Sequence, residues 1–528
     1  MGNGIAGLTA AIEARRLAPA LRIAIITEQS HPTINTPALK QFAIGKLQRE
    51  QLLAYPIGTE RAQQIQVIHG RVVEIHAQGK YVALANGGAL GYGSLLLATG
   101  SVAAGLPAHL PGRDFDGVMT LHRLHDYMSL RRILPEVEDA VVVGAGAHAV
   151  ETVTSLLYLG IRVHWLIRGK TCLSSVLDDR SSELVLQHIR QAGAKVYTET
   201  EIVGIAGNVG AVAGVVTNQQ QMLPCQIVLV CTGMKPVTAL AEHCTLPVMY
   251  ERNRGIVVNN LLRTNVPGIY AAGDVAALQN PLTGVHERRA QWYAAVVQGC
   301  SAAAAMIGQS PKAIQSSGVP WHATRLGELS LLTVGSPLMR TPGSVTLTDN
   351  YKGTYQRLSI LDNRLIGYLS LGQTQPDGLA IKRLIDEGLP IAPVKEALLR
   401  GTFDARKYFS QQHSRSALAM PSPGKQPVVI TAKTAFPSVI QSRPESDSLS
   451  LLDQRKRQID RPLSIVGSMT VAPHPVGVSA SPALAPRSQF IAPVSAQFRA
   501  IQPSQEKDSI SKCRDDPRGR PIHHQERP

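Results

Sequence analysis

The stretch DAVVVGAGAHAVETVTSLLYLGIRVHWLIRG, residues 139–169, decides the fold of this chain. It predicts a buried strand, a glycine turn, a helix and a second strand in one unbroken unit. Gly144 permits a tight turn, Gly146 lets backbone amides approach a pyrophosphate, and Ala149 allows the helix to pack closely on the strand. We interpret the unit as a dinucleotide site, the alternative being a glycine-rich turn without a ligand.

The second strand of this unit ends at Arg168. An acid at this place would bind the ribose 2′-hydroxyl of NAD, whereas an arginine can pair with the 2′-phosphate of NADP. Arg168 and the following Lys170 favour NADPH slightly, and a plain surface arginine is the alternative.

The first seven residues, MGNGIAG, carry the same spacing of small residues. Gly2, Gly4 and Gly7 precede a helical stretch and the apolar run LRIAIITE, residues 21–28, which ends in Glu28. A glycine fingerprint followed by a helix, a strand and an acid about 20 residues on is much stronger than the glycines alone. Only the strand that should precede Gly2 is absent.

Further apolar runs end at glycine turns, in LLLATG (95–100), IVLVCTG (227–233) and GIYAAGD (268–274). Such alternation of strands and helices predicts an α/β fold with two doubly wound Rossmann-like domains. Residues 355–372 have the spacing of a hairpin that turns at Asp362 and Asn363, and residues 377–389 predict an amphipathic helix.

These motifs, with TNVPGIYAAGDVA (264–276), resemble those of the FAD-dependent pyridine nucleotide–disulfide oxidoreductases over about residues 1–400. The resemblance implies that Asp274, after Gly273, binds the FAD ribityl chain and that Glu151 lies near the nicotinamide and flavin. It further implies that FAD is held by Gly2, Gly4, Gly7 and Glu28 with the strand-end turn at Thr99 and Gly100, and NAD(P)H by Gly144, Gly146 and Ala149 with the turn at Gly233.

The cysteines separate the branches of this family. The first of the six is Cys172, inside the second dinucleotide unit, so no redox-active cysteine pair stands beside the flavin, and no spacing fits a metal cluster. Instead INTPALKQFAIGK (34–46) is partly similar to a segment of ferredoxin and rubredoxin reductases and of nitrite-reductase flavin modules. Lys40 or Lys46 would place a cation by the flavin, or either is an exposed solvating charge.

The resemblance also applies to HERRAQWYAAVVQG (286–299), the helix after the Asp274 motif. Its N-terminus would point at the flavin, where the helix dipole favours negative charge. Trp292 would either cover a ring or pack in the core.

The order of the motifs implies the domains. Residues 1–118 and 251–315 form an FAD domain, with an NAD(P) domain inserted at 119–250. Residues 318–403 form a small α+β domain that contributes to an interface, and residues 404–528, rich in Pro and Ser, form a disordered basic tail.

The net charge of +15 is unevenly placed. Of the 53 Lys and Arg, 16 lie after residue 410, against 9 of the 38 Asp and Glu, so the rest of the chain carries a mild surplus. This surplus favours a small acidic electron-carrier protein as partner over nucleic acid. The sequence shows no secretory signal and no membrane span, which predicts a cytoplasmic protein, and leaves a homo-oligomer open.

We therefore expect an enzyme that passes hydride from NAD(P)H to FAD and electrons on to an acceptor such as ferredoxin or rubredoxin. One alternative is the electron-transfer flavin module of a nitrite-reductase-like system, and another is a non-catalytic FAD-binding redox sensor. We also expect a strand of about five or six residues to belong before Gly2, and FAD binding to be weaker without it.

Overall fold

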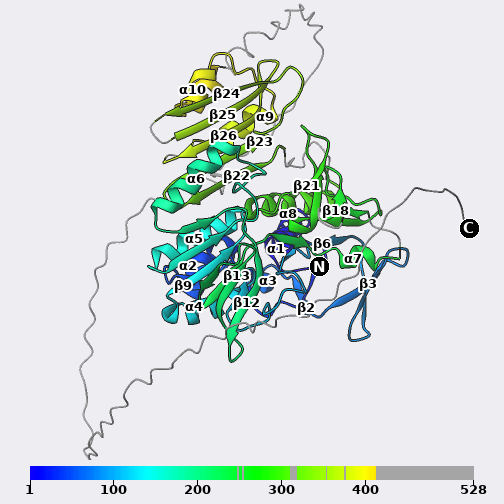
Figure 1. Cartoon of the computed structure of the whole chain (residues 1–528). Helices are drawn as coiled ribbons and strands as arrows, with labels where there is room; N and C mark the ends of the chain where they lie inside the picture. Colours follow the sequence, from blue (N-terminus) through cyan, green and yellow to red (C-terminus); the bar gives the residue numbers. More distant parts are fainter. Residues whose placement is uncertain (246–248, 252–254, 310–317, 352–353, 374–375, 412–528) are drawn as a thin grey trace, which may run out of the picture. The chain divides into compact units, whose positions relative to one another are not determined.

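A computed structural model describes residues 1–245, 249–251, 255–309, 318–351, 354–373 and 376–411 (Figure 1). The predicted tail lies outside these residues except for its first part. There, a helical segment at 405–411 continues the ordered chain, and Tyr408, 3% exposed, donates a hydrogen bond to the Pro390 carbonyl at 2.6 Å. Order therefore extends past residue 404, where the sequence predicted the tail to begin, because this segment buries aromatic side chains.

The first glycine fingerprint lies between two parallel strand pairs. β1 (Ala24–Thr27) pairs with β2 (Gln66–His69), and β6 (Leu95–Leu97) pairs with β19 (Ile269–Ala271). The Met1 α-amino group donates to the Leu96 carbonyl at 2.8 Å, and the Met1 carbonyl accepts from the Ala98 amide at 2.9 Å. The Gly2 amide donates to the Ile26 carbonyl at 2.8 Å. Met1 and Gly2 thus connect the two pairs, and a strand before Gly2 stays a prediction.

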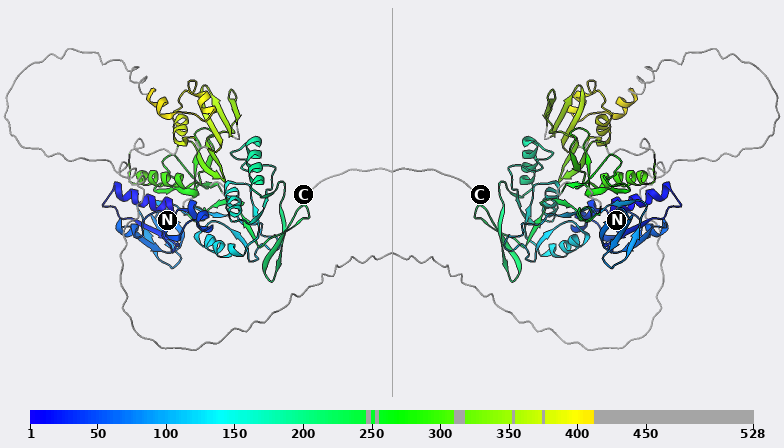
Figure 2. Two further views of the ribbon diagram at one scale, coloured as in Figure 1. Left: turned by 90° about the vertical axis from the view of Figure 1, so that its left-hand side faces the viewer. Right: turned by 90° about the vertical axis from the view of Figure 1, so that its right-hand side faces the viewer.

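Two helices cross closely over this region. α1 (Ile5–Leu17) follows the fingerprint, and α8 (Trp292–Met306) packs against it (Figures 1 and 2). A Cβ on Gly299 of α8 would lie 2.6 Å from the Ala6 carbonyl of α1, which is closer than real contacts allow. Gly299 therefore permits the crossing that brings the segment after Asp274 against the first helix.

The second glycine loop belongs to a five-stranded parallel sheet of order β11-β10-β9-β15-β8. Its strands are β8 (Val118–Thr120), β9 (Asp139–Val143), β10 (Arg162–Leu166), β11 (Lys195–Tyr197) and β15 (Ile227–Val230). The strand order reverses between β9 and β15, and in open parallel sheets ligands bind at the carboxyl ends of the strands beside such a reversal. Gly144 directly follows β9 and Gly233 comes soon after β15.

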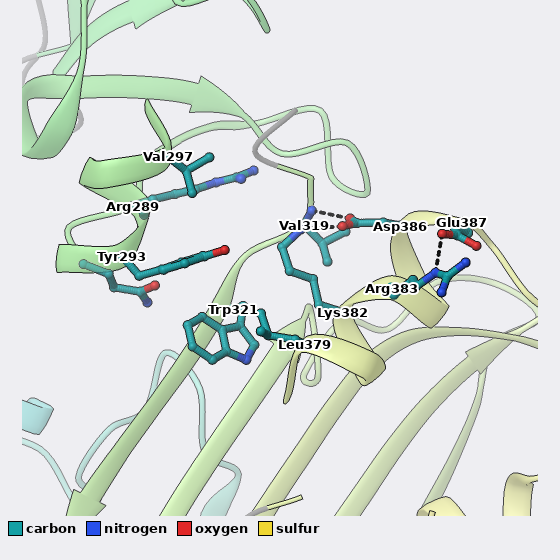
Figure 3. Close-up of a pocket in the computed structure, with 12 residues that line it drawn as sticks. Arg289, Tyr293, Val297, Val319, Trp321, Leu379, Lys382, Arg383, Asp386 and Glu387 are labelled. Atoms are coloured by element: carbon teal, nitrogen blue, oxygen red, sulfur yellow. Dashed lines mark hydrogen bonds and ion pairs between the residues drawn. The ribbon is translucent and has the colours of Figure 1, made fainter. Parts of the chain in front are cut away.

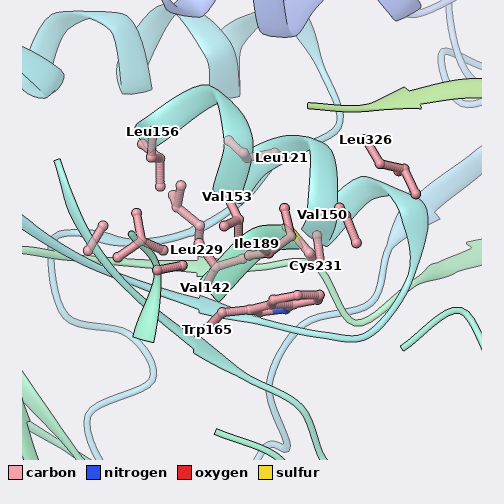
Figure 4. Packing of buried hydrophobic residues seen from close by; sticks show 14 of the residues in the cluster. Leu121, Val142, Val150, Val153, Leu156, Trp165, Ile189, Leu229, Cys231 and Leu326 are labelled. Atoms are coloured by element: carbon pink, nitrogen blue, oxygen red, sulfur yellow. The ribbon is translucent and has the colours of Figure 1, made fainter. Parts of the chain in front are cut away.

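This sheet is held by a packed apolar core (Figure 4). Val142 of β9, Trp165 of β10 and Val153 of α5 (Ala147–Tyr158) are fully buried. The Trp165 indole also donates a hydrogen bond to the Gly144 carbonyl at 2.7 Å. The core therefore fixes the glycine turn as well as the sheet.

The C-terminal described region is an antiparallel sheet of order β22-β23-β26-β25-β24, with α9 (Gly378–Asp386) against β23 and β26. Its strands are β22 (Trp321–Leu326), β23 (Leu329–Gly335), β24 (Val345–Tyr351), β25 (Thr354–Leu361) and β26 (Arg364–Gly372). The predicted hairpin is confirmed, and Asp362 and Asn363 at its turn both have positive φ, of 48° and 59°. The predicted amphipathic helix is also confirmed, as α9.

Further helices and strands complete the described fold. The remaining helices are α2 (Leu39–Ala43), α3 (Thr59–Ala62), α4 (Leu124–Ile133), α6 (Asp179–Gln191), α7 (Ala239–Glu242) and α10 (Lys395–Leu399). The remaining strands are β3 (Val72–His76), β4 (Tyr81–Leu84), β5 (Ala89–Gly91), β7 (Ser101–Ala103), β12 (Ile202–Asn208), β13 (Ala211–Thr217), β14 (Met222–Pro224), β16 (Met234–Pro236), β17 (Tyr250–Glu251), β18 (Gly255–Val258), β20 (Ala276–Gln279) and β21 (His286–Arg288). Across the described ranges, no helix combines the length and apolarity that crossing a membrane requires.

Candidate functional site

The first fingerprint requires glycine at two of its three positions for packing within the protein. Gly2 has φ of 98°, and a Cβ there would lie 2.2 Å from the Ala98 carbonyl oxygen. A Cβ on Gly7 would lie 2.1 Å from the Gly2 carbonyl oxygen. Gly4 differs, because a Cβ there would meet nothing within 4 Å. The turn needs Gly2 and Gly7, whereas Gly4 keeps the entrance of α1 open.

The second loop likewise needs one glycine for packing within the protein and leaves space around another. Gly144 has φ of 134°, and a Cβ there would lie 2.2 Å from the Cys231 carbonyl oxygen. Ala149 is fully buried under the sheet. Gly146 precedes α5 in extended conformation, and a Cβ there would again meet nothing within 4 Å.

The helices after these loops begin without a side-chain cap. Gly4 and Gly146 occupy the N-cap positions of α1 and α5 and offer no oxygen to the first-turn amides. By contrast, Asp178 caps α6 and Asp377 caps α9. Free amides and the positive end of the helix dipole bind anionic groups such as phosphates. Two open, glycine-edged helix starts therefore fit the pyrophosphates of two dinucleotides.

Asp274 lies beside the first loop although it is far away in sequence. It sits in the turn Gly273–Val275 and accepts a hydrogen bond from the Ser101 hydroxyl at 2.8 Å. The Gly273 amide donates to the Gln298 side chain at 2.7 Å, and a Cβ on Gly273 would lie 3.0 Å from the Ala6 Cβ of α1. The Asp274 turn, the turn before Ser101 and the start of α1 therefore form one site.

The predicted strand-end turns are anchored by backbone contacts. The Thr99 hydroxyl donates to the Val237 carbonyl at 2.8 Å, and the Gly100 carbonyl accepts from the Val237 amide at 3.0 Å. Gly233 has φ of 114°, and its carbonyl accepts from the Ala104 amide at 2.9 Å. These hydrogen bonds join the turn after β6 to the turn after β15.

Glu28 and Arg168 lie at the ends of their strands, as expected. Glu28 is exposed directly after β1. Arg168 lies beyond β10 with its side chain 87% exposed, and its Nε is 3.7 Å from a Glu201 carboxylate oxygen. In dinucleotide-binding folds, a side chain at this strand-end position contacts the ribose.

Glu151 joins three segments of the chain. Its carboxylate pairs with Lys40 of α2 and accepts a hydrogen bond from the Thr324 hydroxyl of β22. Burial raises the pKa of Glu151, but Lys40 and the two hydrogen bonds outweigh burial and lower the pKa overall. Glu151 is therefore a carboxylate at neutral pH. Lys40 is not a free solvating charge, and Lys46 lies over the Tyr158 ring, 3.5 Å from its centroid.

His148 lies one helical turn before Glu151 and is held neutral. Burial, followed by the positive charge of Lys40, lowers the pKa of His148 to about 3. Its Nε2 atom is buried and has no hydrogen-bond partner among the described residues. A neutral imidazole with an open ring nitrogen thus stands beside the Lys40–Glu151 pair.

The start of α8 carries further unsatisfied polar atoms. Arg288 donates from Nη2 to the Met234 carbonyl at 2.9 Å. The buried atoms without a hydrogen-bond partner in the described ranges include Arg288 Nη1, Trp292 Nε1 and Gln298 Nε2. Buried polar groups are nearly always paired, so such a group calls for a ligand or ordered water. The half-buried Trp292 fits a place beside a ligand better than a place in the apolar core.

Several residues of this site have no clear sequence pattern that predicts their position. Ser101 and Gln298 contact the Asp274 turn, and Thr324 reaches Glu151 from a strand 173 residues away. Only Ser101 has a local clue, because it directly follows the glycine turn at Gly100. The other two have no distinguishing pattern.

The described cysteines do not form a thiol site. Burial raises the pKa of Cys172 and of Cys231 to about 11, and that of Cys225 to about 12. These thiols are free and protonated at neutral pH. The arrangement supports dinucleotide chemistry rather than disulfide exchange.

The relatives that comparison with known proteins finds include reductases of ferredoxin and of rubredoxin. The chain is 28% identical over 400 residues to the ferredoxin–NAD(+) reductase subunit of a benzene 1,2-dioxygenase system from Pseudomonas putida, covering 75% of this chain and 94% of the relative. It is 27% identical over 315 residues to a rubredoxin–NAD(+) reductase from the same organism, covering 59% of this chain and 80% of the relative.

Solved structures agree with these relatives. A ferredoxin reductase from Rhodopseudomonas palustris has 25% identity and a TM-score of 0.68, covering 77% of this chain and 98% of that chain. Residues 1–299 match the model of the pyridine nucleotide-disulphide oxidoreductase family. The chain therefore belongs to the pyridine nucleotide-disulphide oxidoreductase family and is an FAD-dependent NAD(P)H oxidoreductase.

Proposed function

We propose that this protein transfers hydride from NAD(P)H to FAD and delivers the electrons to a small ferredoxin-like or rubredoxin-like carrier. The observation that carries the proposal is the pair of uncapped, glycine-edged helix starts at α1 and α5. FAD supplies the ability to accept two electrons as hydride. The protein supplies binding, orientation and electrostatics.

We assign FAD binding to the first loop and the turns beside it. The residues are Gly2, Gly4, Gly7, Glu28, Thr99, Gly100, Gly273 and Asp274. The amides at the start of α1 would receive the phosphates, Glu28 a ribose, and Asp274 a hydroxyl of the ribityl chain. Ser101 orients Asp274 by its 2.8 Å hydrogen bond.

We assign NAD(P)H binding to the second loop, through Gly144, Gly146, Ala149, Glu151, Arg168 and Gly233. The amides at the start of α5 would receive the pyrophosphate, and Arg168 a 2′-phosphate. Lys40 and Thr324 hold Glu151 in one orientation, and we assign it a place near the nicotinamide and the flavin. Its negative charge would favour a nicotinamide that becomes positive as hydride leaves.

We also propose how the chain divides into domains. The FAD domain comprises residues 1–118 and 251–315, the NAD(P) domain 119–250, and an interface domain 318–403. The positive surplus of residues 1–410 would attract an acidic carrier. A cytoplasmic location and a homo-oligomer remain predictions.

A second candidate is the flavin module of a nitrogen-oxide reductase system. It is favoured by 26% identity over 389 residues to an assimilatory nitrate reductase electron transfer subunit from Bacillus subtilis, which covers 73% of this chain and 48% of that protein. In this case the chain would pass electrons to a separate reductase component.

The test is an anaerobic titration of the purified, FAD-loaded protein with NADH and with NADPH, followed by reduction of a ferredoxin, a rubredoxin and ferricyanide. We expect loss of the oxidised flavin absorbance and steady carrier reduction. Turnover with ferricyanide alone would favour another acceptor. Absence of all turnover in a flavin-loaded protein would refute the enzyme and support a redox sensor.

A further inference from the structure

A cavity of about 260 Å³ lies between the segment that leads into α8 and helix α9 (Figure 3). Arg289, Tyr293 and Val297 line it from one side, and Trp321, Leu379 and Lys382 from the other. None of these residues belongs to the dinucleotide loops. The cavity is therefore lined by residues other than those to which we assign FAD and NAD(P)H.

Arg289 is the unusual residue of this cavity. It is 7% exposed, and its Nε and Nη1 atoms have no hydrogen-bond partner in the part of the chain that the structure describes. Its neighbour Arg288 faces the Asp274 site and donates to the Met234 carbonyl. Adjacent side chains at the end of a strand point to opposite sides, so Arg289 faces the cavity instead.

The other charges around the cavity are already paired. Lys382 pairs with Asp386, and Arg383 donates to Glu387 at 2.6 Å. Asp386 also accepts from the Val319 amide at 2.7 Å. Burial lowers the pKa of Arg289, and the nearby acids Glu287 and Asp386 act against burial without cancelling it. The Nε and Nη1 atoms of Arg289 therefore remain without a hydrogen-bond partner among the described residues.

A guanidinium stays charged in a protein, and burying it without a partner is costly. Its planar fork matches the two oxygens of a carboxylate. Beside it, the rings of Tyr293 and Trp321 meet edge to face with centroids 5.5 Å apart, and Val297 and Leu379 add apolar surface. The cavity thus combines one unpaired anion receptor with an aromatic and aliphatic wall.

We propose that this cavity binds a small organic anion, an aromatic carboxylate, whose carboxylate pairs with Arg289 and whose ring packs against Tyr293 and Trp321. The site is distinct from hydride transfer and does not rest on the proposed function. Because it joins α8, which follows the Asp274 turn, to α9, an occupant would stabilise the contact between these two helices.

The test is thermal unfolding and calorimetric titration of the FAD-loaded full chain with benzoate, acetate and inorganic phosphate. We expect benzoate to bind saturably and raise the Tm more than acetate or phosphate at equal concentration. In Arg289→Met the benzoate Kd should rise about 10- to 100-fold, as loss of a charge-assisted hydrogen bond predicts. Without benzoate this variant should be as stable as the wild type or more so, because a buried unpaired charge is removed.

Arg340→Met is the matched control, because Arg340 is exposed in the same C-terminal region and does not line the cavity. It should bind benzoate like the wild type. Arg289→Lys keeps the charge without the fork and should fall between the wild type and Arg289→Met. Equal responses to benzoate and acetate would overturn the aromatic assignment. An unchanged benzoate Kd in folded Arg289→Met would overturn the site.

Discussion

Gly146 allows the dinucleotide site to be tested without damaging the fold. A Cβ at this position would meet no protein atom within 4 Å, and its φ of −85° suits any residue. In Gly146→Ala, the lower entropy of the unfolded chain stabilises by roughly 0.4–1 kcal/mol, while the poorer N-cap costs a similar amount. We therefore expect an unfolding free energy within about 0.5 kcal/mol of the wild type.

Dinucleotide binding should respond very differently. The added methyl group would fill the space through which a pyrophosphate approaches the first-turn amides of α5. Loss of one hydrogen bond to a charged group is worth about 1.5–3 kcal/mol, so the Kd of NAD(P)H should rise about 10- to 100-fold. The flavin spectrum should stay unchanged, because the first loop is untouched.

Gly144→Ala is the structural comparison. Its Cβ would lie 2.2 Å from the Cys231 carbonyl oxygen, and its φ of 134° is strained for alanine, so we expect a loss of several kcal/mol of stability. The assays are urea unfolding and titration of NADH and NADPH by calorimetry. A folded Gly146→Ala that binds both dinucleotides like the wild type would refute the assignment of the loop.

Three further predictions concern single contacts. Lys40→Met leaves the Glu151 carboxylate without its cation and should cost about 2 kcal/mol at pH 7, less than a fully buried pair because both side chains are about a quarter exposed. Because the native pKa of Glu151 is lowered, the contribution of the ion pair to stability is present above the ordinary pKa of 4.5 and is lost as the pH falls through the native pKa. The urea midpoints of the wild type and Lys40→Met should therefore converge in acid. Asp178→Ala removes the cap of α6 and the ion-pair partner of buried Arg357, 2.9 Å away, and should lower the free energy of unfolding by about 2–4 kcal/mol. Asp178→Asn keeps part of the cap and should lose less. An alanine variant as stable as the wild type would contradict the contact. Cys172, Cys225 and Cys231 should resist a thiol reagent at pH 8 in the native protein and react fully in urea, as mass mapping of labelled peptides would show, and fast native labelling would disprove their burial.

Local sequence patterns predicted much of this fold because glycine turns, strand runs and helix starts are short-range features. The sequence located β9, the turn at Gly144, α5 and β10 within a few residues. The hairpin turn at Asp362 and Asn363 was predictable because both residue types tolerate positive φ. The helical segment at 405–411 was not predictable, since burial of Tyr408 depends on its contact with Pro390, which composition does not reveal.

The contacts that determine the charges in the site join segments that are far apart in the sequence, so local patterns do not predict them. Glu151 lies at a position that the family resemblance marks, but its state depends on Lys40, 111 residues earlier, and Thr324, 173 residues later. Neither partner has a local pattern that separates it from a surface residue, which is why the sequence slightly favours an exposed solvating charge at Lys40. A carboxylate buried in this place would be raised in pKa without them, so its charge is a property of three segments meeting. The glycine loops are thus short-range features that the sequence reveals, whereas the charge state of Glu151 depends on the meeting of α2, α5 and β22.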